Sequence, residues 1–307
     1  MKNHSNYFLI SLFVLIILSF SGCTKNEDEK YTPTYTEKPI FTKQTYILGV
    51  HPLHNPKKLF KVYQPLVDYI NKHIPTINLK LEASRNYEAY NKKLFSGYFD
   101  FSLPNPYQTV QSLNHGYKIF GKMGDDENFK GIILTRKNGK IKNINDLKGK
   151  TISYPAATAL AATMLPQYFL HMHGININKD IKNNYVGSQE SSIMNLYLNK
   201  SVAAATWPPP WEAFKKERPL IANNLEIKWE TQSLPNNGLV VKDSIPQELI
   251  EQVATIFFSL HTTKEGKEIL KPMELSKFEK AGVQTYKPVE EFLKIFEKEV
   301  REIGGTK

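Results

Sequence analysis

Short apolar strands alternate with amphipathic helices along this chain, and this alternation limits the folds that it can adopt. In the first block, strands are predicted at residues 45–50, 77–82, 99–103 and 130–136, and helices at 59–74 and 86–95. Strands that alternate with helices are typical of parallel βαβ units, in which helices cover a mostly parallel sheet. The pattern therefore predicts an α/β fold.

A second block of the same kind follows. Strands are predicted at 151–154, 182–186 and 201–206, with helices that begin within 155–163 and at 191. Three prolines, Pro208–Pro210, are predicted to halt regular structure before further strands near Trp229 and at 236–241 and a helical C-terminal segment. Two blocks followed by a returning strand predict two lobes joined by a double crossover. We expect a ligand cleft at the carboxyl ends of the strands, with lobe 1 comprising residues 44–135 plus 238–307 and lobe 2 comprising residues 136–237.

An apolar run of 14 residues, Tyr7 to Phe20, precedes Ser21-Gly22-Cys23. A membrane-spanning helix needs about 20 apolar residues, so this run fits the core of a signal peptide better. The small residues before Cys23 resemble a bacterial lipobox. We therefore expect a signal peptide over 1–22, lipidation at Cys23 and a polar tether over 23–43, which would anchor the exported domain to a bacterial cell membrane, in the periplasm or outside the cell. An uncleaved anchor is the alternative, and it leaves the domain in the same place.

Composition narrows the class of function. Cys23 is the single cysteine, so the chain has neither an intramolecular disulfide nor a cysteine-based metal site. The net charge of +10 is scattered, which argues against nucleic-acid binding and supports only a bias toward anionic partners. The sequence contains no nucleophile-elbow, Walker or His-Glu-x-x-His motif, and the acidic run 125–127 is typical of solvated surface. We expect no catalytic residues and no cofactor.

Five segments carry a resemblance to a known family. They are NYEAYNKKLFSGYFDFSLPNPY (86–107), INDLKGKTISYP (144–155), TMLPQYFLHMHGI (163–175), VGSQESSIMNLYLNKSVAA (186–204) and NNGLVVKDSIP (236–246). In this order and spacing they resemble the phosphonate/phosphate-type periplasmic substrate-binding proteins of ABC importers, over about residues 46–297. The resemblance implies a two-lobe periplasmic-binding-protein fold (type II-like) with a hinge and an interlobe cleft.

The chain departs from this family where ligand is bound. The hydroxyl-rich run Ser-Thr-Ser-Gly of the phosphonate binders falls at Ala159–Ala162, which leaves the N–H groups of a helix N-terminus for an anion. A ligand-binding histidine of the family falls at Gln189, and acidic residues that hold an amino group fall at or near Ala203, Pro210–Trp211 and Asn237. The resemblance therefore implies a phosphonate/phosphate-like or aromatic-anionic ligand rather than an aminoalkylphosphonate.

Aromatic and amide side chains replace the missing groups. Tyr87 matches a cleft tyrosine of the family, and Trp207 and Trp211 bracket the three prolines at a strand end. Each candidate has a structural alternative: packing for the tryptophans, the alanine run and the threonines beside it, and an ordinary cap or first helical turn for Tyr87 and the glutamine. The candidate ligand-binding residues are His51, Tyr87, Asn105, Tyr107, Thr158, Ala159, Thr163, Gln189, Trp207 and Asn237.

Histidines also allow a metal interpretation. His51 and His54 lie in one loop, whereas His171 and His173 lie two positions apart on a predicted helix, where their side chains point to different faces. A zinc site needs three or four convergent ligands. We therefore expect no metal site, and a metal-binding protein is kept as the second alternative.

These features predict an extracytoplasmic solute-binding lipoprotein, expected to be monomeric, that closes two lobes on a small anionic ligand. The closed form would then be recognised by the membrane permease of an ABC-type importer. The first alternative is a ligand-sensing module that presents the same closed form to a membrane sensor kinase. The sequence leaves both open.

Overall fold

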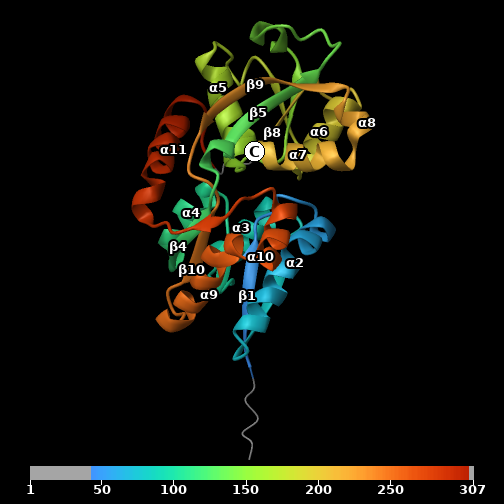
Figure 1. The fold of residues 1–307 in the computed structure, drawn as a ribbon. Helices are drawn as coiled ribbons and strands as arrows, with labels where there is room; N and C mark the ends of the chain where they lie inside the picture. The colour runs from blue at the N-terminus through green and yellow to red at the C-terminus, as the bar shows by residue number, and fades with distance from the viewer. Residues whose placement is uncertain (1–42, 304–307) are drawn as a thin grey trace, which may run out of the picture. The chain divides into compact units, whose positions relative to one another are not determined.

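Two sheets, each covered by helices, make up the part of the chain that the computed structural model describes, residues 43–303 (Figure 1). The predicted signal peptide (1–22), Cys23 and all but the last residue of the predicted tether (23–43) lie outside the described residues. Between residues 43 and 303, no helix is both long and apolar enough to cross a membrane.

Six strands form the sheet of the first lobe, in the order β11-β4-β10-β3-β1-β2. β1 pairs in parallel with β2 and β3, whereas β10 runs antiparallel to β3 and β4. The strands are β1 (Gln44–Val50), β2 (Ile77–Ala83), β3 (Phe101–Leu103), β4 (Tyr117–Met123), β10 (Gly238–Lys242) and β11 (Phe278–Glu279). The helices are α2 (Pro56–His73), α3 (Tyr87–Phe95), α4 (Pro106–Ser112), α9 (Gln247–Ser259), α10 (Lys264–Leu270) and α11 (Lys287–Glu299).

Five strands form the sheet of the second lobe, in the order β7-β6-β8-β5-β9. β6 pairs in parallel with β7 and β8, and β5 is antiparallel to β8 and β9. The strands are β5 (Lys130–Arg136), β6 (Thr151–Tyr154), β7 (Lys182–Tyr185), β8 (Ala203–Thr206) and β9 (Leu225–Ser233). The helices are a π-helical turn (Leu160–Met164) that continues as α5 (Leu165–Met172), then α6 (Gln189–Tyr197), α7 (Pro208–Glu217) and α8 (Pro219–Ala222).

Helix α2 illustrates how the sequence builds these layers. Asn55 caps the helix, because its side chain accepts a hydrogen bond from the backbone N–H of Lys58 at 3.0 Å. Apolar residues then recur at helical spacing and bury one face of the helix against the first sheet. The buried residues of α2 are Leu59, Val62, Tyr63, Leu66, Val67 and Ile70.

The two-lobe α/β fold predicted from the sequence is confirmed by this architecture, but the predicted boundary after residue 135 needs a correction. Strand β5, which the sequence analysis assigned to lobe 1, belongs to the second sheet, so the first crossover lies between β4 and β5. Strand β4 was not predicted, because its burial is mixed and it contains Lys118 and Lys122. An apolar run such as 131–134 would have the same sequence pattern in either sheet. Only the strands with which it pairs show to which lobe it belongs.

The expectation that the three prolines halt regular structure is wrong. They begin helix α7, which starts at Pro208. The N–H groups of a first helical turn have no intrahelical acceptor, so proline loses nothing there and its fixed φ suits the helix. Trp207 precedes them as the N-cap residue. The prolines therefore make a rigid helix start directly after β8.

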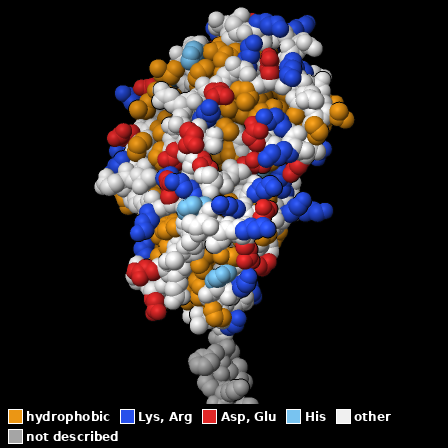
Figure 2. All heavy atoms as spheres, viewed as in Figure 1, with side chains coloured by type: hydrophobic (Ala, Val, Ile, Leu, Met, Phe, Trp, Pro, Cys, Tyr) orange, Lys and Arg blue, Asp and Glu red, His pale blue; other side chains and the backbone are white. Residues whose placement is uncertain are grey.

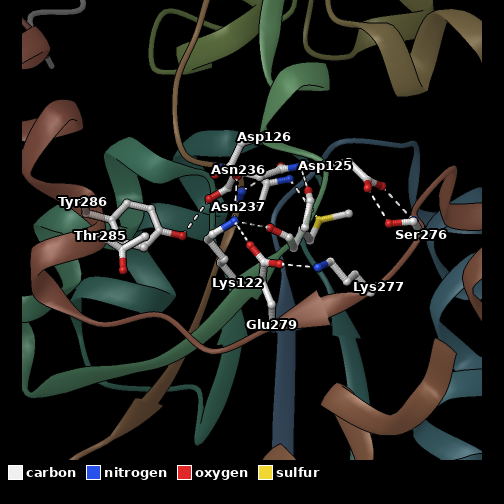
Figure 3. Close-up of polar contacts among 12 residues, drawn as sticks. Lys122, Asp125, Asp126, Asn236, Asn237, Ser276, Lys277, Glu279, Thr285 and Tyr286 are labelled. Carbon is white, nitrogen blue, oxygen red and sulfur yellow. Dashed lines mark hydrogen bonds and ion pairs between the residues drawn. The ribbon is translucent and has the colours of Figure 1, made fainter. Parts of the chain in front are cut away.

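Both crossovers are held together by a network around Lys122 (Figure 3). Lys122 is only 4% exposed, and its ammonium lies 2.7 Å from a carboxylate oxygen of Asp126 and 2.5 Å from one of Glu279. Asp126, in the first crossover, also accepts a hydrogen bond of 2.9 Å from the backbone N–H of Asn236 in the second. The Tyr286 hydroxyl donates to the Asn236 carbonyl at 2.6 Å. This hinge network fixes the two connections against each other and against the first lobe.

The sequence suggested that the acidic run 125–127 is solvated surface. In the structure, Asp125 and Asp126 instead accept hydrogen bonds from distant parts of the chain. Asp125 has φ of +56°, a left-handed conformation, and its carboxylate accepts hydrogen bonds from the backbone N–H and the hydroxyl of Ser276. Besides the nearby Lys122, the residues that donate to Asp125 and Asp126, Ser276 and Asn236, lie more than 100 residues away in the chain. Local composition therefore gives no sign of them.

Helix α11 adds a third link between the lobes. It begins in the segment assigned to lobe 1, yet the Phe292 ring lies 5.6 Å from that of Tyr168 on α5. Just beyond the helix, the Arg301 guanidinium donates to the carbonyl of Ala157 at 2.6 Å and to Oε1 of Gln167 at 2.9 Å. The C-terminal segment therefore contacts the second lobe as well as the first.

Candidate functional site

A small cavity lies where residues that follow strands of both sheets come together. About 210 Å³ of space not filled by protein atoms lies in it, part of which is open solvent. The first lobe and the second crossover contribute loop and helix-start residues, the second lobe contributes the starts of three helices, and one residue comes from the first crossover. The lining residues are His51, Tyr87, Asn105 and Asn237, then Ala159, Leu160, Ala161, Ala162, Gln189 and Trp207, and finally Phe129.

Three helices of the second lobe begin at this cavity. Ala159 is the N-cap residue of the helix that starts at Leu160, Gln189 is the first residue of α6, and Trp207 caps α7. The first N–H groups of the helices that start at Leu160 and Gln189 have no intrahelical acceptor, and the helix dipole adds partial positive charge there, whereas α7 begins with three prolines that carry no N–H group. The second-lobe wall of the cavity therefore favours an anion.

Close packing places the first of these helices. A Cβ atom on Gly131 of β5 would lie 2.6 Å from the Ala161 carbonyl oxygen and 2.6 Å from Cδ of Pro166. Glycine at this position therefore allows the helix backbone to lie directly on β5. The alanines of the run lie at the cavity wall.

The first-lobe wall is formed by polar side chains that their neighbours hold in place. Nδ1 of His51 lies 2.9 Å from the Leu103 carbonyl, and the His51 ring lies edge-on to that of Tyr87 at 6.1 Å. Asn105 caps α4 through its Oδ1, and its Nδ2 donates to the Thr158 carbonyl of the other lobe at 3.0 Å. This contact is a direct hydrogen bond between the lobes.

Tyr87 and Gln189 meet across the cavity. Burial raises the pKa of the Tyr87 hydroxyl, and a hydrogen bond with the Gln189 side chain lowers it in part. Oε1 of Gln189 accepts a hydrogen bond from the Thr206 hydroxyl at 2.9 Å, which orients the amide. Gln189 therefore presents its NH₂ group toward Tyr87 and the cavity.

The cavity carries no formal charge on its walls. Its lining contains no Asp, Glu, Lys or Arg. Burial lowers the pKa of His51 to about 4, so the imidazole is neutral at pH 7. On the face of the molecule shown in Figure 2, by contrast, acidic and basic side chains are interspersed.

An aromatic pair closes one side of the cavity. The Trp207 and Phe129 ring centroids are 5.4 Å apart with an angle of 61° between the planes, and both side chains are 2% exposed. Trp211, which we expected beside Trp207 at the cleft, instead packs against Phe214 in a separate apolar cluster of the second lobe. Trp207 precedes the helix in extended conformation, with φ of −142° and ψ of 164°, whereas Trp211 lies within α7, so helical spacing does not place the two indoles on one face.

Seven of the ten candidate residues line the cavity: His51, Tyr87, Asn105, Ala159, Gln189, Trp207 and Asn237. The other three, Tyr107, Thr158 and Thr163, do not. Thr158 contributes its carbonyl to the hydrogen bond with Asn105, Tyr107 lies near Arg301, and Thr163 is buried with a hydroxyl that has no partner among the described residues. Ligand contact by the seven stays a prediction.

Sequence reasoning missed Phe129 as a lining residue. It lies directly before β5, in the first crossover. A residue directly before the first strand of the second lobe is expected near the cleft. Because β5 was assigned to the first lobe, Phe129 was not recognised as such a residue.

Two ion pairs cross between the lobes near the end of α7. Nζ of Lys58 on α2 lies 2.8 Å from Glu217, and Nζ of Lys216 lies 2.6 Å from Glu274. The two α7 residues are adjacent in the chain and carry opposite charges. Their partners, Lys58 and Glu274, also carry opposite charges. We call this set the α7 ion pairs.

Residues 43–303 contain no group of three or more His, Cys, Asp or Glu side chains placed to hold a metal ion. Nδ1 of His173 instead donates to the Phe169 carbonyl at 2.7 Å, and the His173 ring lies beside the Phe169 ring. The described structure therefore gives the metal alternative no support.

Comparison with known proteins now adds to this geometry. The family model for the periplasmic substrate-binding protein of ABC phosphonate transporters matches residues 48–286. The fold is similar to a binding protein component of an ABC phosphonate transporter from Pseudomonas aeruginosa, with a TM-score of 0.77 and 15% identity over 83% of this chain and 87% of that one. No curated protein sequence gives a significant match.

Two further solved structures share the fold. PhnD1 from Prochlorococcus marinus, in complex with methylphosphonate, has a TM-score of 0.75 and 22% identity over 83% of this chain and 99% of that one. The alkanesulfonate-binding protein from Xanthomonas axonopodis pv. citri, bound to MOPS, has a TM-score of 0.60 and 13% identity over 85% and 94%. At such identities the structures show the fold, whereas the family model extends over most of the chain. The chain therefore belongs to the family of periplasmic substrate-binding proteins of ABC phosphonate transporters, and it is a binding protein rather than an enzyme.

Proposed function

We propose that this protein is an exported lipoprotein, anchored through Cys23, that captures a small phosphonate- or phosphate-like anion and delivers it to the permease of an ABC importer. The observation that carries the proposal is the interlobe cavity, where two helix N-termini of one lobe, at Leu160 and Gln189, face amide and aromatic side chains of the other. Because the cavity walls carry no negative charge, nothing opposes the attraction between the helix dipoles and a bound anion.

The size of the cavity supports a small ligand. The space that it leaves for water-sized spheres is about 10 Å³, far below the roughly 300–1,000 Å³ of sites for drug-sized molecules. A tetrahedral anion with a short substituent suits this space better than an aromatic anion. Trp207, Phe129 and Tyr87 would then pack against the substituent. PhnD1, which shares the fold, binds methylphosphonate.

The charge of the cavity disfavours an aminoalkyl ligand. An ammonium group taken out of water needs a carboxylate or several acceptors, since burying an unpaired charge is costly. No carboxylate lies among the cavity residues. Ligands with a neutral substituent therefore fit the proposal better.

Titration with small anions tests the proposal. The protein, freed of co-purifying ligand, is expected to bind methylphosphonate or phosphate with a Kd of about 1 μM or lower, equivalent to about −8 kcal/mol. 2-Aminoethylphosphonate and phenylphosphonate should bind more weakly. Calorimetry measures the affinities, and the fluorescence of Trp207 should change in a Trp211→Phe, Trp229→Phe background, which leaves it as the single tryptophan. A folded, ligand-free protein that responds to none of these anions would contradict the proposal.

Restoring hydroxyls to the alanine run should strengthen oxyanion binding. Ala159 and Ala161 are 2% and 4% exposed and line the cavity, so Ala159→Ser and Ala161→Ser each place a donor at the proposed anion. One added hydrogen bond of about 1 kcal/mol corresponds to about a fivefold lower Kd. Calorimetry with phosphate checks the gain, with Ala222→Ser, buried outside the cavity, as the matched control. Unchanged affinity in both cavity variants would show that the run does not face the anion.

A further inference from the structure

The first-lobe wall of the cavity presents an unused hydrogen-bond acceptor at Asn237. This residue is fully buried, and its Oδ1 has no partner among the described residues. Its Nδ2 lies 3.3 Å from Sδ of Met123, and its backbone N–H donates to Asn236. A flipped amide would set the oxygen lone pairs against those of the sulfur, so the orientation with Oδ1 free is favoured. A buried acceptor without a partner is rare and points to a missing donor.

His51 supplies a second acceptor on the same wall. A carbonyl oxygen only accepts hydrogen bonds, so the 2.9 Å contact with Leu103 places the ring proton on Nδ1. Burial keeps the ring neutral, and Nε2 therefore carries a lone pair. Nε2 makes no hydrogen bond to any residue that the structure describes.

The opposite wall presents donors instead. The first-turn N–H groups behind Ala159 and the amide of Gln189 face the cavity from the second lobe. A bound anion thus meets donors on one side and, at Asn237 and His51, acceptors on the other. An oxygen that carries no proton would direct its lone pairs at those acceptors, with little room for a water between them.

Building on the proposed function, we propose that Asn237 and His51 select anions by proton count: the cavity takes a tetrahedral oxyanion that retains an O–H group, such as a hydrogen phosphonate, and rejects a fully ionised one, such as a sulfonate. The proton of the ligand is donated to Oδ1 of Asn237, the lone pair of His51 Nε2 disfavours an ionised oxygen beside it, and the remaining oxygens accept from the second lobe. A site built to satisfy a ligand hydroxyl discriminates strongly against an analogue without it, because its own buried group is left unpaired.

Methylphosphonate and methanesulfonate form the test pair, since they have the same shape. At pH 6 both are monoanions, but only methylphosphonate carries a proton. Calorimetry on the full mature protein is expected to show methylphosphonate binding at least about 30-fold more tightly, the equivalent of one unsatisfied buried group. Asn237→Leu, which removes the acceptor, should reduce this ratio to below about threefold. Asn237→Asp, which keeps acceptor oxygens and adds charge, should preserve or enlarge it.

Thr135→Val is the matched control, because Thr135 is fully buried in β5, lies outside the cavity and also has an unpartnered hydroxyl. Its ratio should equal that of the unchanged protein. Equal affinity of the unchanged protein for both anions would overturn the selection by proton count while leaving anion capture intact. Binding of neither anion by folded protein would overturn both proposals. If Asn237→Leu does not fold, as judged by circular dichroism, the Asn237→Asp ratio decides, and its fall to below about threefold would refute the role of the acceptor.

Discussion

Replacing Trp207 by alanine is expected to abolish measurable binding of methylphosphonate and to lower the free energy of unfolding by about 3–5 kcal/mol. Trp207 is 2% exposed and contacts Phe129, so its loss removes a wall of the cavity and leaves a void that the surrounding residues cannot fill. Urea denaturation followed by circular dichroism measures the stability, and calorimetry measures the binding.

Trp211 provides the matched control for this prediction. It is on the same helix and 4% exposed, but it packs in the core of the second lobe away from the cavity. Trp211→Ala should cost a similar free energy of unfolding and leave the Kd within about threefold. Trp207→Phe and Trp211→Phe repeat the comparison with smaller voids. If the two positions weaken binding equally, Trp207 serves packing alone.

Acidification from pH 6.5 to pH 4 is expected to remove about 3 kcal/mol of stability through His51. Burial lowers the pKa of His51 to about 4 in the folded protein, whereas an unfolded chain titrates near 6.5. In this interval the unfolded state binds the proton and the folded state does not. The contribution is therefore fully present above pH 6.5, falls as the pH falls, and stops falling below pH 4.

The free energy of unfolding, measured in urea at a series of pH values, checks this expectation. His51→Asn should reduce the slope of the curve between pH 6.5 and pH 4, while Thr135→Val, which changes no titratable group, should leave the slope unchanged. The pKa of His54 is lowered in the same direction, so some slope should persist in His51→Asn. A curve of unaltered slope in that variant would mean that His51 is accessible to protons in the folded protein.

The elements that position the site were predictable because of one geometric rule. The carboxyl ends of parallel strands meet at one edge of a sheet, so residues after β1, β2, β3, β6, β7 and β8 lie near the cleft whatever the details of packing. His51, Asn105 and Trp207 were identified in this way, and the cavity contains all three.

Other features depended on pairing or rotation that local sequence does not encode. Strand β5 is apolar enough for either sheet, and only its antiparallel partners β8 and β9 assign it to the second. Thr163 is in the expected helix, but it does not line the cavity, and its buried hydroxyl has no partner among the described residues. The hinge network joins Lys122 to Glu279, 157 positions later, and no local pattern predicts that contact.

Helix α7 has a consequence for how ligand capture responds to the surrounding medium. Trp207 at its start touches the cavity, Lys216 and Glu217 at its end form the α7 ion pairs with the first lobe, and the prolines stiffen the turn between β8 and the helix body. Dissolved ions weaken such exposed pairs and leave the sheltered cavity contacts almost untouched. A change in ionic strength would then alter the lifetime of the closed form without altering which solute the protein recognises.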